Sequence, residues 1–208
     1  MLVLMASLIF VPAGTFDYWQ GWMYIGLAVL CSWISSIYLF RNNRAALERR
    51  QLKSESRPVQ RVLAAVAYSW AVAMVVFSVL DHRFGWSHVP AAVSILGAVL
   101  VVIATGAVTL VVAQNNHAAI TVRVEEGQPL ISTGLYGVVR HPMYTCNALL
   151  MVGTPLALGS YWGLVFIIPG LLIFALRIRD EETLLREELA GYAAYMQKVP
   201  HRLVPGVW

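Results

Sequence analysis

The chain has 208 residues, of which 59% are hydrophobic and only 12% are charged, and its mean hydropathy is +0.66. Soluble domains carry about 25% charged residues, so this composition excludes an ordinary water-soluble protein and predicts an integral membrane protein. The net charge of +4 would also fit a nucleic-acid-binding protein, but the basic residues gather beside apolar segments. Membrane topology explains that distribution better, and we expect no nucleic-acid partner.

The cysteines and histidines do not form the cluster of ligands that a metal site needs. Cys31 and Cys146 both lie in apolar surroundings, which is typical of small buried residues. The five histidines are scattered along the chain, at positions 82, 88, 117, 141 and 201. We therefore expect no bound metal.

The apolar segments predict an all-α, polytopic membrane bundle of about five to six transmembrane helices. The expected helices cover residues 1–13, 18–40, 62–80, 90–113, 143–158 and 162–176. Thirteen residues at about 1.5 Å each fall short of a hydrocarbon core of about 30 Å, so whether the first helix crosses the bilayer stays open. The last two are also short and contain Pro155 and Pro169, which favours a helical hairpin beside an aqueous pocket. Gly97 and Gly106 predict close helix contacts.

The distribution of Lys and Arg predicts how the bundle is oriented. A basic linker, residues 41–61, falls on the same side of the predicted helices as residues 114–140 and 177–208, and together these segments carry fourteen of the fifteen Lys and Arg residues. Only Arg83 falls on the other side. The positive-inside rule makes the basic side cytoplasmic, in the inner or plasma membrane if the protein is bacterial.

This organisation divides the chain into two parts. Residues 1–113 supply the N-terminal transmembrane helices and the basic linker, and residues 114–208 form a core of a polar loop, the short hairpin and a C-terminal helix. That last helix is predicted to be amphipathic and to lie at the cytosolic membrane surface, with a bend at Gly191. Its apolar stripe consists of Leu185, Leu189, Tyr192, Met196 and Val199.

Two polar clusters flank the hairpin, in residues 132–144 and 177–182. The first crowds glycines, tyrosines, Arg140 and His141 around Pro142, a residue that suits the first turn of a helix. Helix N-termini present free N–H groups, so this cluster predicts a ligand cradle. The alternative is an ordinary helix boundary, with charged side chains that reach toward lipid phosphates. Both clusters lie on the predicted cytoplasmic side, where soluble charged cofactors are available.

Several motifs between residues 115 and 208 form one pattern. They are Gly134-Leu135-Tyr136, Arg140-His141-Pro142-Met143-Tyr144, Gly159-Ser160, Glu181-Glu182, Gly191-Tyr192 and the final Arg202-Leu203-Val204-Pro205-Gly206-Val207-Trp208. In this pattern the chain resembles the isoprenylcysteine carboxyl methyltransferase (ICMT) family and the related integral-membrane phospholipid methyltransferases. It departs from the family at Cys146-Asn147, where many relatives have glycine, and at Leu189-Ala190. The first departure bears on the identity of the methyl acceptor.

The resemblance implies S-adenosylmethionine as the methyl donor and a lipophilic or small-molecule acceptor that enters from the bilayer, among membrane lipids. It implies cofactor-binding roles for Gln128, Pro129, Leu130, Ile131, Tyr136, His141, Pro142, Met143, Tyr144, Glu181 and Glu182. The implied catalytic residues are Arg140, Arg177 and His141. The two arginines would position the acceptor, because guanidinium groups bind carboxylates by paired hydrogen bonds.

The resemblance implies carboxyl O-methylation of an isoprenylcysteine-like or other lipophilic acceptor, and the alternatives are phospholipid N-methylation and small-thiol S-methylation. A carboxylate is already nucleophilic at neutral pH, whereas an amine or thiol needs a base, for which His141 is the nearby candidate. A non-catalytic transport or assembly module is a further alternative. The predicted mid-membrane stretches lack Asp, Glu, Lys and Arg, which favours the enzyme. The sequence does not indicate an oligomeric state.

Overall fold

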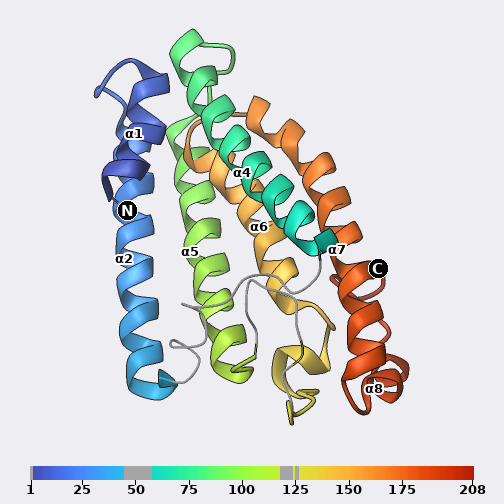
Figure 1. Ribbon diagram of the computed structural model, residues 1–208. Helices are drawn as coiled ribbons and strands as arrows, with labels where there is room; N and C mark the ends of the chain where they lie inside the picture. The colour runs from blue at the N-terminus through green and yellow to red at the C-terminus, as the bar shows by residue number, and fades with distance from the viewer. Residues whose placement is uncertain (1, 45–57, 118–123, 125–126) are drawn as a thin grey trace.

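The computed structural model describes residues 2–44, 58–117, 124 and 127–208. In these residues every regular element is a helix, which confirms the predicted all-α bundle (Figure 1). The elements are α1 (Leu2–Ala13), α2 (Trp19–Asn42), α4 (Pro58–Phe84), α5 (Ala91–Gln114), the 3-10 helix η1 (Gly134–Gly137), α6 (Pro142–Ala157), the 3-10 helix η2 (Trp162–Phe166), α7 (Ile167–Glu188) and α8 (Tyr192–Lys198). Most of the predicted basic linker, and part of the predicted polar loop, lie outside the described residues.

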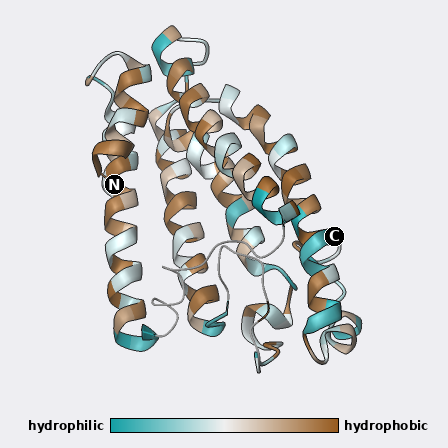
Figure 2. Ribbon diagram, viewed as in Figure 1, coloured by the Kyte–Doolittle hydropathy of each residue, from teal (hydrophilic) through white to brown (hydrophobic). Residues whose placement is uncertain are grey.

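Four helical stretches of the described chain are long and apolar enough to cross a membrane: α2, α4, α5 and the continuous stretch of η2 and α7. The helices α1 and α6 have 12 and 16 residues. At about 1.5 Å per residue both are shorter than a hydrocarbon core of about 30 Å, so α1 does not reach across it. Hydrophobic residues line the lengths of the helices, and hydrophilic residues gather at their ends (Figure 2). The protein is therefore an integral membrane protein.

The second helix of the predicted hairpin is longer than expected. It does not end near residue 176, because α7 continues without a break to Glu188 and carries the second polar cluster on its last turns. The separate C-terminal helix that was expected is therefore the end of α7, followed by the short α8. Gly191 lies between the two with φ +82°, a left-handed conformation that suits glycine. The predicted bend at Gly191 is confirmed.

Helix α4 runs at an angle to the packed helices α2, α5 and α6. Helices α2 and α5 pack side by side, and α5 packs closely on α6. Helix α4 runs obliquely across the bundle, in contact with α1 at one end and with α7 along its other part (Figure 1). Because α4 diverges from α6, the bundle has room for a cavity between them.

Glycines bring α5 and α6 into direct backbone contact. A Cβ atom on Gly97 would lie 2.4 Å from the backbone nitrogen of Ala157, and one on Gly153 would lie 3.0 Å from the carbonyl oxygen of Gly97. The predicted close contact at Gly97 is therefore confirmed. The prediction for Gly106 is wrong, because a Cβ atom there would meet nothing within 4 Å among the described residues.

At the end of the bundle opposite the polar clusters, a buried carboxylate links α4 to the hairpin. Asp81, with 0% of its surface exposed, accepts hydrogen bonds from the backbone nitrogen of Ser87 at 2.7 Å, from its hydroxyl at 2.6 Å and from the Ser160 hydroxyl at 2.6 Å. Buried carboxylates need such partners. This cluster joins the end of α4 to the turn between α6 and η2, and so fixes the hairpin against α4.

The two glycines of α5 provide a matched test of this packing. We expect Gly97→Ala to lower the free energy of unfolding by about 2 kcal/mol, because the new methyl group would overlap the backbone of α6. Gly106→Ala should leave stability unchanged or raise it by up to about 1 kcal/mol, since alanine is the better helix former and the position is open. Denaturant titration of both purified variants in the same detergent measures the difference, and equal stabilities would contradict the packing.

Candidate active site

A cavity of about 500 Å³ opens between α4, α6 and α7 and extends to the loop before η1 and to α8. Its volume lies in the range of small-molecule binding sites. The end of the cavity near α8 is lined by polar and aromatic side chains, and the part between α4 and α6 is lined almost entirely by apolar ones. We refer to these parts as the polar end and the apolar arm.

The structure brings the predicted site residues together. All of them except Glu182 line this one cavity. They are Gln128, Pro129, Leu130, Ile131, Tyr136, Arg140, His141, Pro142, Met143, Tyr144, Arg177 and Glu181. The hairpin explains the convergence, because α6 begins and α7 ends at the same face of the membrane.

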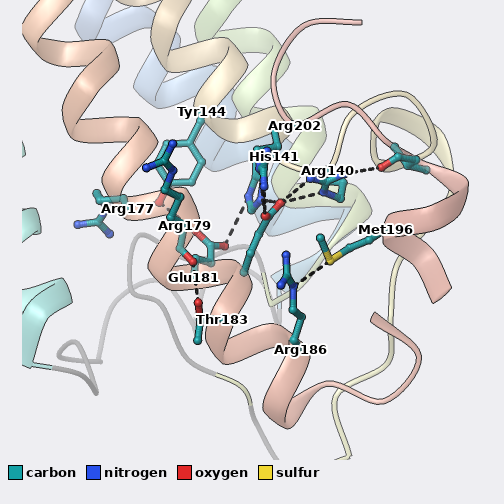
Figure 3. A network of polar contacts seen from close by, with 12 residues as sticks. Arg140, His141, Tyr144, Arg177, Arg179, Glu181, Thr183, Arg186, Met196 and Arg202 are labelled. Atoms are coloured by element: carbon teal, nitrogen blue, oxygen red, sulfur yellow. Dashed lines mark hydrogen bonds and ion pairs between the residues drawn. The ribbon is translucent and has the colours of Figure 1, made fainter. Parts of the chain in front are cut away.

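Glu182 is buried in the protein, beside the cavity. Only 2% of its side chain is exposed, and its Oε1 atom lies 2.8 Å from both Nε and Nη2 of Arg140. The same oxygen lies 3.2 Å from Nε2 of His141, and Oε2 accepts hydrogen bonds from Nε and Nη2 of Arg202, both at 3.0 Å. The network is drawn in Figure 3. We name Arg140, His141, Glu182 and Arg202 the Glu182 network. Within it, Glu182 fixes the positions of the other three side chains from outside the cavity.

Backbone contacts add to the Glu182 network. The backbone nitrogens of Arg140 and His141 donate to the carbonyl oxygens of His201 and Arg202, at 2.9 and 3.0 Å. The Nη1 atom of Arg140 donates to the carbonyl oxygens of Val199 and Pro200, at 2.7 and 2.8 Å. The C-terminal segment therefore fixes the entry of α6. It also engages the Arg140 guanidinium, so the prediction that Arg140 positions an acceptor stays a prediction.

Glu181 faces the cavity, one position before Glu182. Its Oε2 atom accepts a hydrogen bond from the Tyr144 hydroxyl at 3.0 Å, and Oε1 lies 3.9 Å from Nδ1 of His141. Arg177 Nε donates to the same Tyr144 hydroxyl at 3.3 Å. A helical step of about 100° separates the two carboxylates, which explains why one enters the cavity and the other the protein. Glu181, with 23% of its side chain exposed, can bind a cation in the cavity.

The loop before α6 is held over the polar end by α8. The Tyr195 hydroxyl donates to the carbonyl oxygen of Tyr136 at 2.6 Å. Burial raises the pKa of Tyr195 to about 12 and also raises the pKa of Tyr136, so both hydroxyls stay protonated at neutral pH. The predicted apolar stripe packs on Leu130 and Val124, which means that it covers the loop of the site instead of facing lipid.

The apolar arm lies between small residues of α4 and larger residues of α6. On α4 the wall is formed by Ala64, Ala67 and Ala71, whose spacing places them on one helix face. Leu150 and Met151 of α6 line the same arm. The Tyr24 hydroxyl, 3.4 Å from the hydroxyl of Thr154, marks where α2 reaches the cavity. The arm is suited to a hydrocarbon chain.

A buried glutamine fixes α4 beside Arg177. Gln60, with 0% of its surface exposed, donates from Nε2 to the carbonyl oxygen of Arg177 at 3.2 Å and to Oδ2 of Asp180 at 2.7 Å. These contacts determine how far α4 stands from α7 at the junction between the polar end and the apolar arm.

Several lining residues were missed by reasoning from the sequence. Asn115 and His117 line the polar end directly after the apolar run of α5. Hydrogen-bonding residues at a membrane helix end were a usable signal, since they stand on the same side as both polar clusters. The alanines of α4 carried no such signal, because their role depends on α4 lying opposite α6.

Comparisons with known proteins agree with this arrangement. The family model for phospholipid methyltransferases (PEMT) matches residues 92–190, from α5 to the end of α7. Among solved structures, the chain is similar to that of the eukaryotic intramembrane Ras methyltransferase ICMT (isoprenylcysteine carboxyl methyltransferase), with a TM-score of 0.55 and 16% sequence identity over 99% of this chain and 74% of that chain. At that identity the likeness shows the fold. A comparison with curated proteins gave no match.

The matched family and the shared fold identify the class of protein. The chain is an integral-membrane methyltransferase: residues 92–190 match the phospholipid methyltransferase family model, and the fold is similar to that of ICMT. The predicted resemblance is thereby confirmed. Its methyl acceptor is a separate question, which the chemistry of the cavity addresses.

The burial of Glu182 leads to a prediction about stability. We expect Glu182→Gln to lower the free energy of unfolding by about 3 kcal/mol, because it leaves the buried Arg140 guanidinium without its carboxylate. Glu187→Gln, at an exposed position of the same helix, should change stability by less than about 0.5 kcal/mol. Thermal unfolding of the two variants in detergent compares them. Similar unfolding temperatures would show that the Glu182 network does not hold the site.

Proposed function

We propose that the protein transfers a methyl group from S-adenosylmethionine to the carboxylate of a lipophilic acceptor, of the isoprenylcysteine-like class or another with a hydrocarbon tail. One observation carries this proposal: a single cavity joins a polar end with a cation-binding carboxylate to an apolar arm, and Arg177 lies at their junction. The two substrates of such a reaction differ in the same way, since one is polar and charged and the other is apolar.

The polar end fits S-adenosylmethionine in its donor set. The Glu181 carboxylate would bind the ammonium or attract the sulfonium, and the faces of Tyr136 and Tyr144 suit a cation or an adenine ring. When bound, the cofactor supplies an electrophilic methyl group on its sulfonium. The cradle formed by Gln128, Pro129, Leu130 and Ile131 would cover it under α8.

Arg177 favours an anionic acceptor at the junction. Arg177 is 5% exposed, and its Nε donates to the Tyr144 hydroxyl. Gln60 ties the helix that carries it to α4. A carboxylate held there would be aimed into the polar end while its tail lay in the apolar arm. Methyl transfer forms a carbon–oxygen bond as the carbon–sulfur bond breaks, and alignment is the main requirement. No proton has to be removed.

The surroundings of His141 favour the same acceptor. Nε2 of His141 lies 3.2 Å from Glu182, and Nδ1 lies 3.9 Å from Glu181, so both ring nitrogens face carboxylates. An amine or thiol acceptor would need a base that points at it. This geometry suits a residue that orients the two carboxylates better than one that removes a proton.

A second candidate is N-methylation of a phospholipid amine. The match to the phospholipid methyltransferase family favours it, because the matched residues include the whole hairpin. The apolar arm suits an acyl chain as well as an isoprenoid. The chemical stability of the product separates the two candidates, since alkali hydrolyses methyl esters and leaves N-methyl and S-methyl groups intact.

We further propose that the polar end faces the cytoplasm, because fourteen of the fifteen Lys and Arg residues belong to segments on that side. A cysteine introduced at the exposed Glu187 should react with a membrane-impermeant maleimide only after cells are permeabilised. A cysteine at the exposed His88, at the opposite end, should react in intact cells. The reverse pattern would invert the orientation.

The proposed reaction can be tested with one variant and one label. We expect the wild type to transfer radiolabelled methyl groups from S-adenosylmethionine into a lipid extract, and the label to be released by alkali as methanol. Glu181→Gln should weaken cofactor binding by roughly tenfold to a hundredfold, because it removes a charge-assisted interaction. Calorimetry in detergent measures this affinity.

The exposed Glu187→Gln serves as the matched control and should bind the cofactor as the wild type does. Folded wild-type protein that does not bind S-adenosylmethionine would refute the proposed function. Label that resists alkali would exclude a carboxylate acceptor and favour an amine or a thiol.

A further inference from the structure

Asn147 occupies an unusual position on the wall of the cavity. It lies on α6 and lines the cavity, yet its side-chain amide forms no hydrogen bond with any residue in the described part of the chain. Its neighbour Cys146 is buried and does not line the cavity. Of the pair Cys146-Asn147, which departs from the family pattern, only Asn147 therefore lines the cavity.

The position of Asn147 along α6 is between the two parts of the cavity. Tyr144, at the polar end, is three residues earlier, and Leu150, in the apolar arm, is three residues later. Each step corresponds to a rise of about 4.5 Å on the same helix face. The amide therefore stands just beyond the junction where the acceptor carboxylate would lie.

Other polar side chains on this wall already have partners. The Tyr144 hydroxyl bonds Glu181, and the Thr154 hydroxyl lies 3.4 Å from that of Tyr24. An amide on an apolar wall costs free energy unless it is paired, since it gives up its bonds to water. Asn147 offers both a donor and an acceptor to whatever occupies the cavity.

We propose that Asn147 is a specificity-determining residue that hydrogen-bonds an amide or carbonyl of the acceptor, between its methylated carboxylate and its hydrocarbon tail. This inference rests on the proposed function and narrows it. The acceptor then has three parts in order: a carboxylate at Arg177, a hydrogen-bonding linker at Asn147 and a tail in the apolar arm. A simple fatty acid lacks the linker and should bind less tightly.

Two probes of equal chain length test the inference. N-dodecanoylglycine has a carboxylate, an adjacent amide and a straight tail, and pentadecanoate has the same number of chain atoms without the amide. We expect the wild type to bind the amide probe about fivefold to tenfold more tightly, as one hydrogen bond would give. Asn147→Leu should remove this preference and leave the affinity for S-adenosylmethionine unchanged. Calorimetry in one detergent measures all three affinities.

Two further variants make the comparison independent of folding. Asn147→Ala, which adds no bulk, should lose the preference in the same way as Asn147→Leu. Asn42→Leu changes an exposed amide that bonds its own helix at Tyr38, and it should keep the wild-type preference.

Each outcome decides between the inference and the proposed function. The inference is overturned if the wild type binds both probes equally, or if its preference survives Asn147→Ala. In either case, binding of S-adenosylmethionine by the wild type would still support the proposed function. Failure to bind either probe also overturns the inference, because an amphipathic carboxylate of this length would be excluded. Loss of cofactor binding by the wild type would refute the proposed function itself.

Discussion

The carboxylate of Glu182 joins three parts of the chain that lie far apart in the sequence. Arg140 and His141 precede α6, Glu182 lies near the end of α7, and Arg202 belongs to the C-terminal segment. Buried charges are stable only with partners, so the carboxylate and its cations can be buried only together. Their pairing closes the hairpin of α6 and α7 at its polar end, and the cavity exists because that end is closed.

The same pairing gives two neighbouring carboxylates different roles. Glu182 is satisfied within the protein, while Glu181 reaches the cavity with only Tyr144 as a close hydrogen-bond donor among the residues described. A charge that is already fully paired could not bind a cationic ligand well, since its lone pairs would be in use. Because the two residues are one helical step apart, Glu182 stabilises the structure of the site while Glu181 is left to bind a ligand.

Much of this fold could be predicted from the sequence, because membrane helices are recognised from the length and composition of apolar segments. The bend at Gly191 and the contact at Gly97 followed from local rules. The opposite assignments of Glu181 and Glu182 did not, because both border the same helix face in the sequence pattern. The apolar stripe from Leu185 to Val199 was expected to lie at the membrane surface, but it packs on the loop of the site. A stripe shows that a face is buried without showing what covers it. The oblique course of α4, which creates the apolar arm, depends on contacts of Gln60 and Asp81 with residues about eighty to one hundred and twenty positions away.

Along one face of the short helix α6, the side chains change from charged and polar at its start to apolar further along. His141 and Tyr144 stand at its start, Asn147 follows, and Leu150 and Met151 lead to the pair of Thr154 and Tyr24. Such a gradient matches the boundary between water and the bilayer interior, and an amphipathic molecule would adopt the same order along it. A methyl donor from water and an acceptor from lipid need only approach that boundary from opposite sides to meet. The shortness of α6 is consistent with this function. Because the helix begins inside the protein, its polar N-terminus lies at the wall of the cavity.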